Sequence, residues 1–451
     1  MEKLVLSLVL SLLLSSVASI REISSNLCSS EFKDEKYHLN SSGLHLTLYH
    51  PRSPCGPAPL PDLTFSTILT HDDSRVASLE ARLSKKTSSR PTSLELQPEL
   101  ATSPLTPGTS VGVGNYVTKI GLGSPATSYV MVVDTGSSLT WLQCSPCVVS
   151  CHAQAGPVFN PKTSNTYRQV SCTASECSAL ESATLNPSAC SKSNVCIYQA
   201  SYGDSSFSVG YLSSDTLTFA GSSVRNFIYG CGQDNEGLFG RSAGLIGLAR
   251  NKLSFLYQLA PSLGNSFGYC LPSTSSSGYL SIGSYNPGQY SYTPLVSSSL
   301  DDSLYFLQFS SISVNGRPIG VSSSAYDAPT IIDSGTVISR LPSDVYDALS
   351  KAVSAAMAKA PKASAYSILD TCFKGSASKL SVPAVSLTFQ GGATMKLSSE
   401  NVFIDVDSST TCLAFAPSSR VAIVGNTQQQ TFSVVYDVGK SRVGFAPGGC
   451  R

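Results

Sequence analysis

Two short segments of this 451-residue chain repeat one pattern of chemically active residues, Val130 to Ser137 and Pro329 to Thr336. Each has an apolar run followed by aspartate, a hydroxyl residue, glycine and a second hydroxyl residue. Glycine lets the backbone turn tightly and approach a neighbouring loop, and the hydroxyls can fix a carboxylate or a facing loop. The two aspartates, Asp134 and Asp333, are far apart in the chain. The doubled pattern therefore predicts two similar lobes that each contribute one carboxylate.

Two carboxylates held together can hydrolyse an amide without a metal or a histidine. Like charges about 3 Å apart cannot both ionise, so the pair shares one proton and titrates as a unit. A water between them then has a base on one side and an acid on the other. One Asp-Thr-Gly tripeptide would be weak evidence, because two such turns can also close hairpins, but the repeated pattern with its flanking residues is far more specific.

The histidines and the overall charge exclude several other kinds of function. Beyond residue 100 the chain has one histidine, His152, so a Ser-His-Asp or Cys-His site would have to use it, and no H-E-x-x-H motif occurs. Charged residues make up 13% of the chain and the net charge is +1. We therefore expect no capture of nucleic acid or of an anionic membrane.

The chain divides into regions that differ in amino-acid composition and residue pattern. Residues 1–18 have the basic start, apolar run and small residues of a secretory signal peptide. Residues 19–110 are predicted to be a pro-segment, with a mobile extension as the alternative. Within them a helix is predicted over 66–86, with Leu69, Val76, Leu79 and Leu83 on one side. From residue 111 the pattern is typical of β-strands, apart from a helix predicted to begin at 343 and to stop at Pro361. A serine-rich piece, 273–278, could join two lobes.

Fourteen cysteines in a chain with a signal peptide point to disulfides. Twelve of them follow residue 111, an even number that permits six bridges, but counting alone leaves the pairing open. A zinc site built from Cys144, Cys147, Cys151 and His152 is the less favoured alternative.

Residues 111–451 resemble a pepsin-family aspartic protease. The likeness is carried by Gly114-Asn115-Tyr116, by Gly121 to Pro125, by Asp134 to Trp141 and by Asp333-Ser334-Gly335-Thr336. It implies an all-β, bilobal fold with an active-site cleft between two β-rich lobes and a few short helices. The N-terminal lobe would span 111–275, with the first catalytic aspartate, a cysteine-rich insert and the flap, and the C-terminal lobe 276–451, with the second aspartate.

The resemblance also assigns roles to single residues. Asp134 and Asp333 would be the catalytic pair. Ser137 and Thr336 would hydrogen-bond them, while Thr135 and Ser334 would cross-link the two loops. The remaining residues of the motifs are Gly136 and Gly335, and the flap over the substrate would use Tyr202, Gly203 and Trp141, the last as hydrogen-bond partner of the tyrosine.

The crowding of cysteines between the first loop and the flap resembles the nepenthesin-like, atypical aspartic proteases of plants. The pairing implied by that likeness is Cys144–Cys147, Cys151–Cys231, Cys172–Cys196, Cys177–Cys190, Cys270–Cys450 and Cys372–Cys412. The segment from Leu46 to Pro57 is similar to that of a subgroup described as chloroplast nucleoid DNA-binding proteases, although nothing in the sequence supplies a DNA site.

The expected function is aspartic endopeptidase, made as a secreted zymogen and acting on polypeptides. We expect a monomer with no cofactor, no metal, no nucleic-acid partner and no membrane anchor. The extracellular cell wall space (apoplast) is the first choice of compartment, and the vacuole or plastid is the alternative. The rival interpretation is a catalytically inactive pepsin-fold protein that binds or inhibits cell-wall hydrolases.

Overall fold

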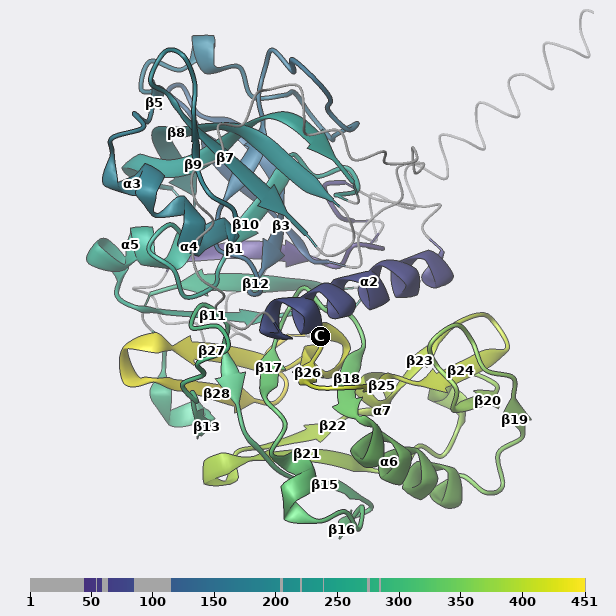
Figure 1. Ribbon diagram of the computed structural model, residues 1–451. Coiled ribbons are helices and arrows are strands. Elements are labelled where there is room, and N and C mark those ends of the chain that lie inside the picture. Colours follow the sequence, from purple (N-terminus) through teal and green to yellow (C-terminus); the bar gives the residue numbers. More distant parts are fainter. Residues whose placement is uncertain are drawn as a thin grey trace, which may run out of the picture.

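The computed structural model describes residues 44–53, 55–58, 64–84, 115–202, 206–219, 221–237, 239–273, 276–283 and 285–450. The predicted signal peptide lies outside these ranges. The described chain forms two β-rich lobes, and a long helix, α2 (Phe65–Ser84), lies across the molecule between them (Figure 1). The expectation of a bilobal, mainly β fold is confirmed. Within these ranges no helix is both long and apolar enough to span a membrane.

The first lobe is a strongly paired β-structure in which β8 and β9 form the longest hairpin. Its innermost strand, β3, is buried on both faces along its last six residues, which fits its run of Tyr, Val and Met side chains. The strands are β2 (Val117–Leu122), β3 (Thr127–Asp134), β4 (Trp141–Gln143), β5 (Arg168–Gln169), β6 (Ala189–Cys190), β7 (Cys196–Ser201), β8 (Phe207–Phe219), β9 (Ser222–Glu236) and β10 (Gly244–Gly247), and the helices are α3 (Ser175–Ser178), α4 (Leu180–Thr184) and α5 (Phe255–Leu263).

The second lobe holds three smaller sheets. The first, in the order β14-β17-β26-β18-β25, contains β14 (Phe306–Leu307), β17 (Thr330–Ile332), β26 (Ala422–Val424), β18 (Ser339–Pro342) and β25 (Phe415–Ser418). The second contains β15 (Phe309–Val314), β16 (Arg317–Pro318), β21 (Val385–Phe389) and β22 (Thr394–Leu397). The third contains β19 (Lys362–Ala363), β20 (Cys372–Lys374), β23 (Phe403–Asp405) and β24 (Thr410–Leu413).

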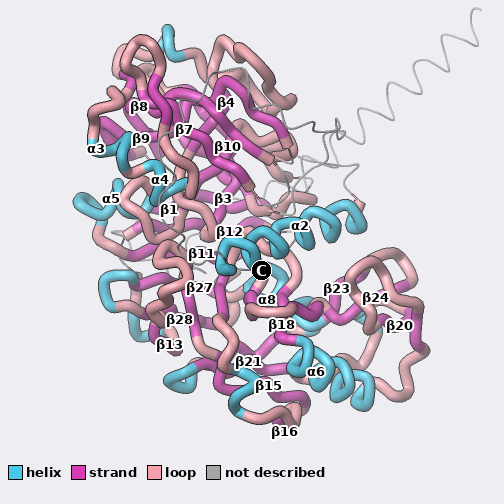
Figure 2. Tube along the Cα trace, viewed as in Figure 1, coloured by secondary structure: helices cyan, strands magenta, loops and turns pink. Residues whose placement is uncertain are grey.

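The helices of the second lobe are α6 (Ser343–Ala356), α7 (Ser399–Val402) and α8 (Asn426–Gln429), shown in cyan in Figure 2. Helix α6 is the one predicted from residue 343, and it buries Val345, Leu349 and Val353 as its spacing indicated. It ends at Ala356, earlier than expected from Pro361, because Met357 already departs from helical geometry.

A group of strands from both halves of the chain joins the lobes: β1 (Leu44–Tyr49), β11 (Ser266–Cys270), β12 (Ser277–Ile282), β13 (Ser291–Pro294), β27 (Ser433–Asp437) and β28 (Arg442–Ala446). Strand β1, which belongs to the predicted pro-segment, pairs antiparallel with β12 over its whole length. Its Leu46 and Leu48 are buried in the main core. This part of the predicted pro-segment is therefore paired into the sheet and packed in the core.

Helix α2 matches the helix predicted over 66–86, and its apolar side faces the second lobe. Near its start, Phe65, Ile68 and Leu69 pack into an apolar cluster of that lobe. Further along, Val76 and Leu79 enter a second cluster. Burying these side chains is what holds the helix across the molecule, since each fully buried aliphatic side chain stabilises a packed state by about 1.5–3 kcal/mol.

Candidate active site

The two predicted catalytic aspartates meet at the interface of the lobes. Asp134 ends β3, Asp333 follows β17 directly, and both side chains are fully buried. Each lobe repeats one local geometry: a parallel neighbour, β10 or β26, flanks the strand that carries the aspartate. The internal repeat in the sequence therefore corresponds to a repeat in structure.

The glycine of each motif holds its own aspartate and makes room for the other. The N–H of Gly136 donates to Asp134 Oδ1 at 2.9 Å, and that of Gly335 donates to Asp333 Oδ1 at 3.0 Å. A Cβ atom at Gly136 would lie 2.9 Å from Asp333 Oδ1, and one at Gly335 would lie 2.6 Å from Asp134 Oδ1. Both glycines thus leave room for the opposite carboxylate and for Arg75 Nη2, which is nearer still to both Cβ positions.

The first hydroxyl of each motif reaches across to the other loop, as the resemblance implied. Ser334 N–H donates to Thr135 Oγ1 at 2.9 Å, and Thr135 N–H donates to Ser334 Oγ at 3.3 Å. Thr135 Oγ1 also lies 3.4 Å from Asp333 Oδ1. These buried contacts join the two loops that carry the aspartates, and so help to set the separation of the two carboxylates.

The second hydroxyls differ between the lobes. Thr336 Oγ1 donates to Asp333 Oδ2 at 2.7 Å, as expected. The matching bond from Ser137 to Asp134 is not formed, and the buried Ser137 Oγ has no hydrogen-bond partner. Instead, Asp134 Oδ2 faces the guanidinium of Arg75, whose Nη1 lies at 3.5 Å. An ionic neighbour thus stands where a neutral hydroxyl was expected.

Arg75, from helix α2, binds both aspartates at once. Its Nη2 lies 2.7 Å from Asp134 Oδ1 and 2.9 Å from Asp333 Oδ2, and its Nε donates to Asp333 Oδ2 at 3.0 Å. Burial disfavours the charge, but the two carboxylates outweigh burial and raise the pKa of Arg75 above its usual value. The guanidinium therefore stays charged whenever the helix is in place.

The predicted flap contact is present. Trp141 Nε1 donates to Tyr202 Oη at 2.7 Å, and the ring of Phe239 makes edge contacts with both rings, 4.7 Å from Trp141 and 5.7 Å from Tyr202. Tyr202 follows β7, which pairs antiparallel with β8, a strand that begins at Phe207. Gly203 falls outside the described residues.

A small cavity, open to solvent, remains between the flap and α2. Arg75, Asp134, Ser137 and Tyr202 line it together with Leu185, which follows helix α4 in the cysteine-rich insert. That the insert reaches this site could not be predicted from sequence, because Leu185 belongs to no motif.

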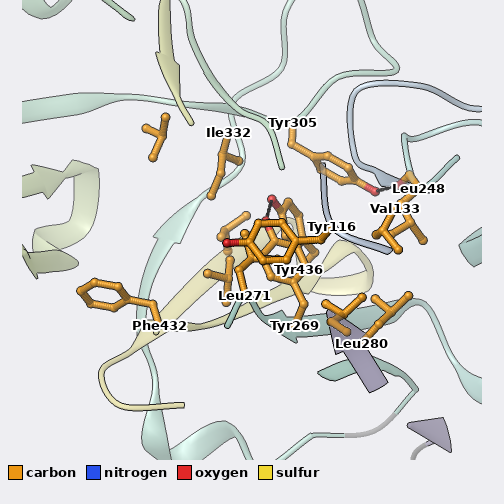
Figure 3. Close-up of a cluster of buried hydrophobic side chains, with 14 of the residues drawn as sticks. Tyr116, Val133, Leu248, Tyr269, Leu271, Leu280, Tyr305, Ile332, Phe432 and Tyr436 are labelled. Atoms are coloured by element: carbon orange, nitrogen blue, oxygen red, sulfur yellow. Dashed lines mark hydrogen bonds between the residues drawn. The ribbon is translucent and has the colours of Figure 1, made fainter. Parts of the chain in front are cut away.

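Sequence reasoning also missed a buried polar support beneath Asp333. Gln429 Nε2 donates to the backbone oxygens of Asp333 and Val424, at 3.2 and 2.8 Å. Gln429 in turn accepts a hydrogen bond from Tyr269, which pairs with Tyr436 at 2.8 Å between the hydroxyls. Figure 3 shows these tyrosines among the apolar side chains of the core. Gln429 is the middle residue of a run of three glutamines, Gln428 to Gln430, and nothing in that run predicts which of them lies beneath Asp333.

Four of the six disulfide pairings implied by the resemblance are wrong. The structure has Cys144–Cys231, Cys147–Cys151, Cys172–Cys190 and Cys177–Cys196, while Cys270–Cys450 and Cys372–Cys412 are as expected. The reason is the strand register: β4 lies parallel to β9, which brings Cys144 and Cys231 to a Cα separation of 5.3 Å.

The zinc alternative is also contradicted, since Cys144, Cys147 and Cys151 are all used in disulfides and offer no thiolate to a metal. His152, the fourth residue of that alternative, has a ring nitrogen, Nε2, 2.8 Å from the backbone oxygen of Ser242. Burial lowers the pKa of His152.

The chain is similar to known proteins along most of its length. Family models described as xylanase inhibitor N-terminal and xylanase inhibitor C-terminal match residues 116–284 and 304–447. An aspartyl protease family protein of Arabidopsis thaliana is 44% identical over 420 residues, which cover 91% of this chain and 87% of the relative. Aspartic proteinase nepenthesin-2 of Nepenthes gracilis is 36% identical over 75% of this chain and 78% of its own. The crystal structure of edgp shares the fold, with a TM-score of 0.62 and 22% identity over 74% of this chain and 92% of that one.

Proposed function

The chain belongs to the nepenthesin-like family of plant aspartic proteases and is an aspartic endopeptidase. From this premise we propose that Asp134 and Asp333 form its catalytic dyad. We also propose that helix α2 keeps the enzyme inactive as a zymogen. The single observation that carries the proposal is that one atom, Arg75 Nη2, lies within 3 Å of both carboxylates. A water in that position would contact both aspartates.

In the mature enzyme the dyad shares one proton. The ionised carboxylate takes a proton from the water, and the water oxygen attacks the carbonyl carbon of the scissile peptide bond. The protonated partner hydrogen-bonds the carbonyl oxygen, and a proton from the dyad then passes to the leaving amine nitrogen. The N–H groups of Gly136 and Gly335 hold the Oδ1 atoms of their own aspartates, and Thr336 Oγ1 also donates to Asp333 Oδ2, so both carboxylates stay in place while they bind water and substrate.

Substrates are polypeptides, and we propose that they bind as extended strands beneath the flap at Tyr202. An extended peptide satisfies its backbone by hydrogen bonds along the cleft and places alternate side chains into pockets. The cavity that remains beside Asp134 lies on this path.

Inhibition in the zymogen follows from where α2 lies. Arg75 occupies the site of the catalytic water, and the apolar side of the helix covers the second lobe. Because Arg75 stays charged, its ion pairs with the dyad weaken only when the aspartates gain protons. Acidification therefore both loosens the helix and gives the dyad the proton that it needs.

The alternative is an inactive binding or inhibitor protein, favoured by the description of the matching family models. An inhibitor needs no paired carboxylates in the cleft, and here both motifs keep their aspartate, glycine and hydroxyls. The protease proposal accounts for these residues, and the inhibitor alternative does not.

Purified precursor, incubated at falling pH, tests the proposal. Wild-type protein should lose its N-terminal segment at acid pH and digest an added protein. Asp134→Asn and Asp333→Asn should fold yet lose activity by several orders of magnitude, because each carboxyl acts in the same transition state. Asp327→Asn, at an exposed position outside the cleft, is the matched control and should behave as wild type. A folded Asp333→Asn protein with most of its activity would refute the dyad.

Compartment and assembly are also proposals. Six disulfides among the described cysteines of residues 115–450 fit a chain that folds in an oxidising compartment. We propose secretion to the cell wall space, with vacuole or plastid as alternatives, and a monomeric enzyme.

A further inference from the structure

One carboxylate of helix α2, that of Asp72, is bound by three groups of the second lobe. Asp72, one helical turn before Arg75, has a fully buried side chain. Its Oδ1 accepts a hydrogen bond from the N–H of Val337, and its Oδ2 accepts one from the N–H of Ile338 at 3.1 Å. The guanidinium of Arg340 completes the site, with Nη1 3.1 Å from Asp72 Oδ2. Two backbone donors and an arginine form a built receptor for a carboxylate.

Arg340 belongs to the enzyme itself and is held rigidly. It lies on β18, between β25 and β26, and its Nη1 also donates to the backbone oxygen of Ile338 at 2.7 Å. Its side chain is 1% exposed. The buried Nη2 has no hydrogen-bond partner and lies 3.6 Å from Asp73, a second carboxylate of α2. The guanidinium of Arg340 thus faces α2, but α2 does not supply a hydrogen-bond acceptor for its Nη2.

Removal of α2 would leave this cation without a counter-ion. Among the described residues, the carboxylates within 4 Å of Arg340 are Asp72 and Asp73, and both leave with the helix. A guanidinium and two free N–H groups beside the catalytic loop would then face the cleft. An unpaired polar cluster of this kind is costly unless water or a ligand satisfies it.

We propose that Arg340, together with the N–H groups of Val337 and Ile338, forms a substrate subsite that binds an aspartate or glutamate side chain, and that Asp72 fills this subsite in the precursor. This inference rests on the protease function proposed above. It makes Arg340 a specificity-determining residue, and it gives the mature enzyme a preference for polypeptides with an acidic residue close to the bond that is cut.

The distance along the cleft limits where that acidic residue stands. Asp72 and Arg75 are three residues apart in a helix, which corresponds to a rise of about 4.5 Å. An extended substrate advances about 3.3 Å per residue. The acidic side chain is therefore expected within about two residues of the scissile bond.

The test uses mature enzyme and pairs of synthetic peptides that differ by Asp against Asn at one position, scanned over the three residues on each side of the cut. At one position the Asp peptide should have a kcat/KM about 10- to 100-fold higher, because hydrogen bonds to a charged group are worth more than those to a neutral one. The preference should shrink as the pH falls below about 4, where the peptide carboxyl itself becomes protonated.

Arg340→Gln should abolish this preference while still cutting the Asn peptide, and Arg340→Lys should restore part of it. Arg442→Gln removes an arginine that pairs with Asp437 on β27 and is the matched control, with the preference unchanged. Equal cleavage of Asp and Asn peptides by wild-type enzyme at every position overturns the subsite and leaves the protease function intact. Failure to cut either peptide counts against the protease function itself. A preference that survives in Arg340→Gln also overturns the proposal.

Discussion

Thr135 and Ser334 lie 199 residues apart, and the backbone N–H of each donates to the side-chain hydroxyl of the other. This reciprocal pair is buried directly under the two aspartates. It joins one loop of each lobe without any covalent link, so we expect the geometry of the two aspartates to depend on it.

Replacing Thr135 with valine tests that dependence, because valine keeps the shape and removes the hydroxyl. The N–H of Ser334 loses its acceptor and stays buried, which should lower the free energy of unfolding by about 1–3 kcal/mol. We expect kcat to fall by more than the loss in free energy of unfolding would explain, since the two loops are no longer joined by this hydrogen bond. Urea unfolding and kcat, measured on the same preparations, separate the two effects.

Thr388→Val is the matched control for that substitution. Thr388 Oγ1 pairs with Thr394 Oγ1 at 3.2 Å on the partly exposed hairpin β21–β22, outside the cleft. We expect little change in either quantity. A Thr135→Val enzyme with wild-type kcat would show that the cross-link is not needed for catalysis.

The parts of the site that could be predicted from sequence are those marked by a short local pattern of residues. Asp-hydroxyl-Gly-hydroxyl is short and repeated, so Asp134 and Asp333 could be named together with their supporting glycines. The pairing of Trp141 with Tyr202 followed from the family resemblance and is present in the structure. The apolar spacing of the 66–86 segment likewise predicted helix α2, since a 3.6-residue period is readable from sequence.

The failures have a common physical cause, which is dependence on tertiary register. Arg75 follows no motif, and its role exists only because α2 crosses the dyad. Four cysteines of the insert could pair with one another in three ways: Cys172, Cys177, Cys190 and Cys196. Cys190 and Cys196 lie opposite each other on β6 and β7, and each pairs with a different partner, Cys172 and Cys177. Such outcomes depend on how strands and helices meet rather than on residue spacing.

Arg75→Gln in the precursor should release the enzyme early. The substitution removes the charge that binds both aspartates, while glutamine keeps much of the length and some hydrogen bonding. We expect self-processing about tenfold faster at a given acid pH, with full-length protein followed on gels over time. Arg168→Gln, at an exposed position on β5, should process as wild type. Unchanged processing of Arg75→Gln would remove Arg75 from the inhibitory mechanism.

His50 is predicted to give the proposed pro-segment a second pH-dependent contact. It follows β1, stacks edge-on against Tyr116 at 5.5 Å, and accepts a hydrogen bond at Nδ1 from the N–H of Arg52. Burial, then the charge of Arg52, lower the pKa of His50 to about 3. The charged groups that face it are Arg52 and, across a small cavity, Arg241. None of these neighbours stabilises a protonated ring.

The sign of the effect follows from this lowered pKa. A released His50 has a pKa near 6.5 and binds a proton more readily than the docked one, so docking is favoured fully above about pH 6.5 and weakens progressively down to about pH 3. His50→Phe keeps the ring and removes the titration, and at pH 4.5 it should slow loss of the pro-segment about tenfold. Processing followed from pH 3 to 7 checks this, and a wild-type pH profile in the variant would contradict it.

The disulfide that closes the longest loop should add more to the free energy of unfolding than the one that closes the shortest loop. Cys270–Cys450 closes a separation of 180 residues and ties β11 to the C-terminal end of the chain, whereas Cys147–Cys151 closes a separation of 4. If loop closure in the unfolded chain dominates, removing the long bridge should cost about 5 kcal/mol and removing the short one about 2 kcal/mol. The paired variants are Cys270→Ser with Cys450→Ser, and Cys147→Ser with Cys151→Ser. Urea unfolding of mature protein without reductant measures both, and equal losses would mean that strain or residual structure, rather than chain entropy, sets their contribution.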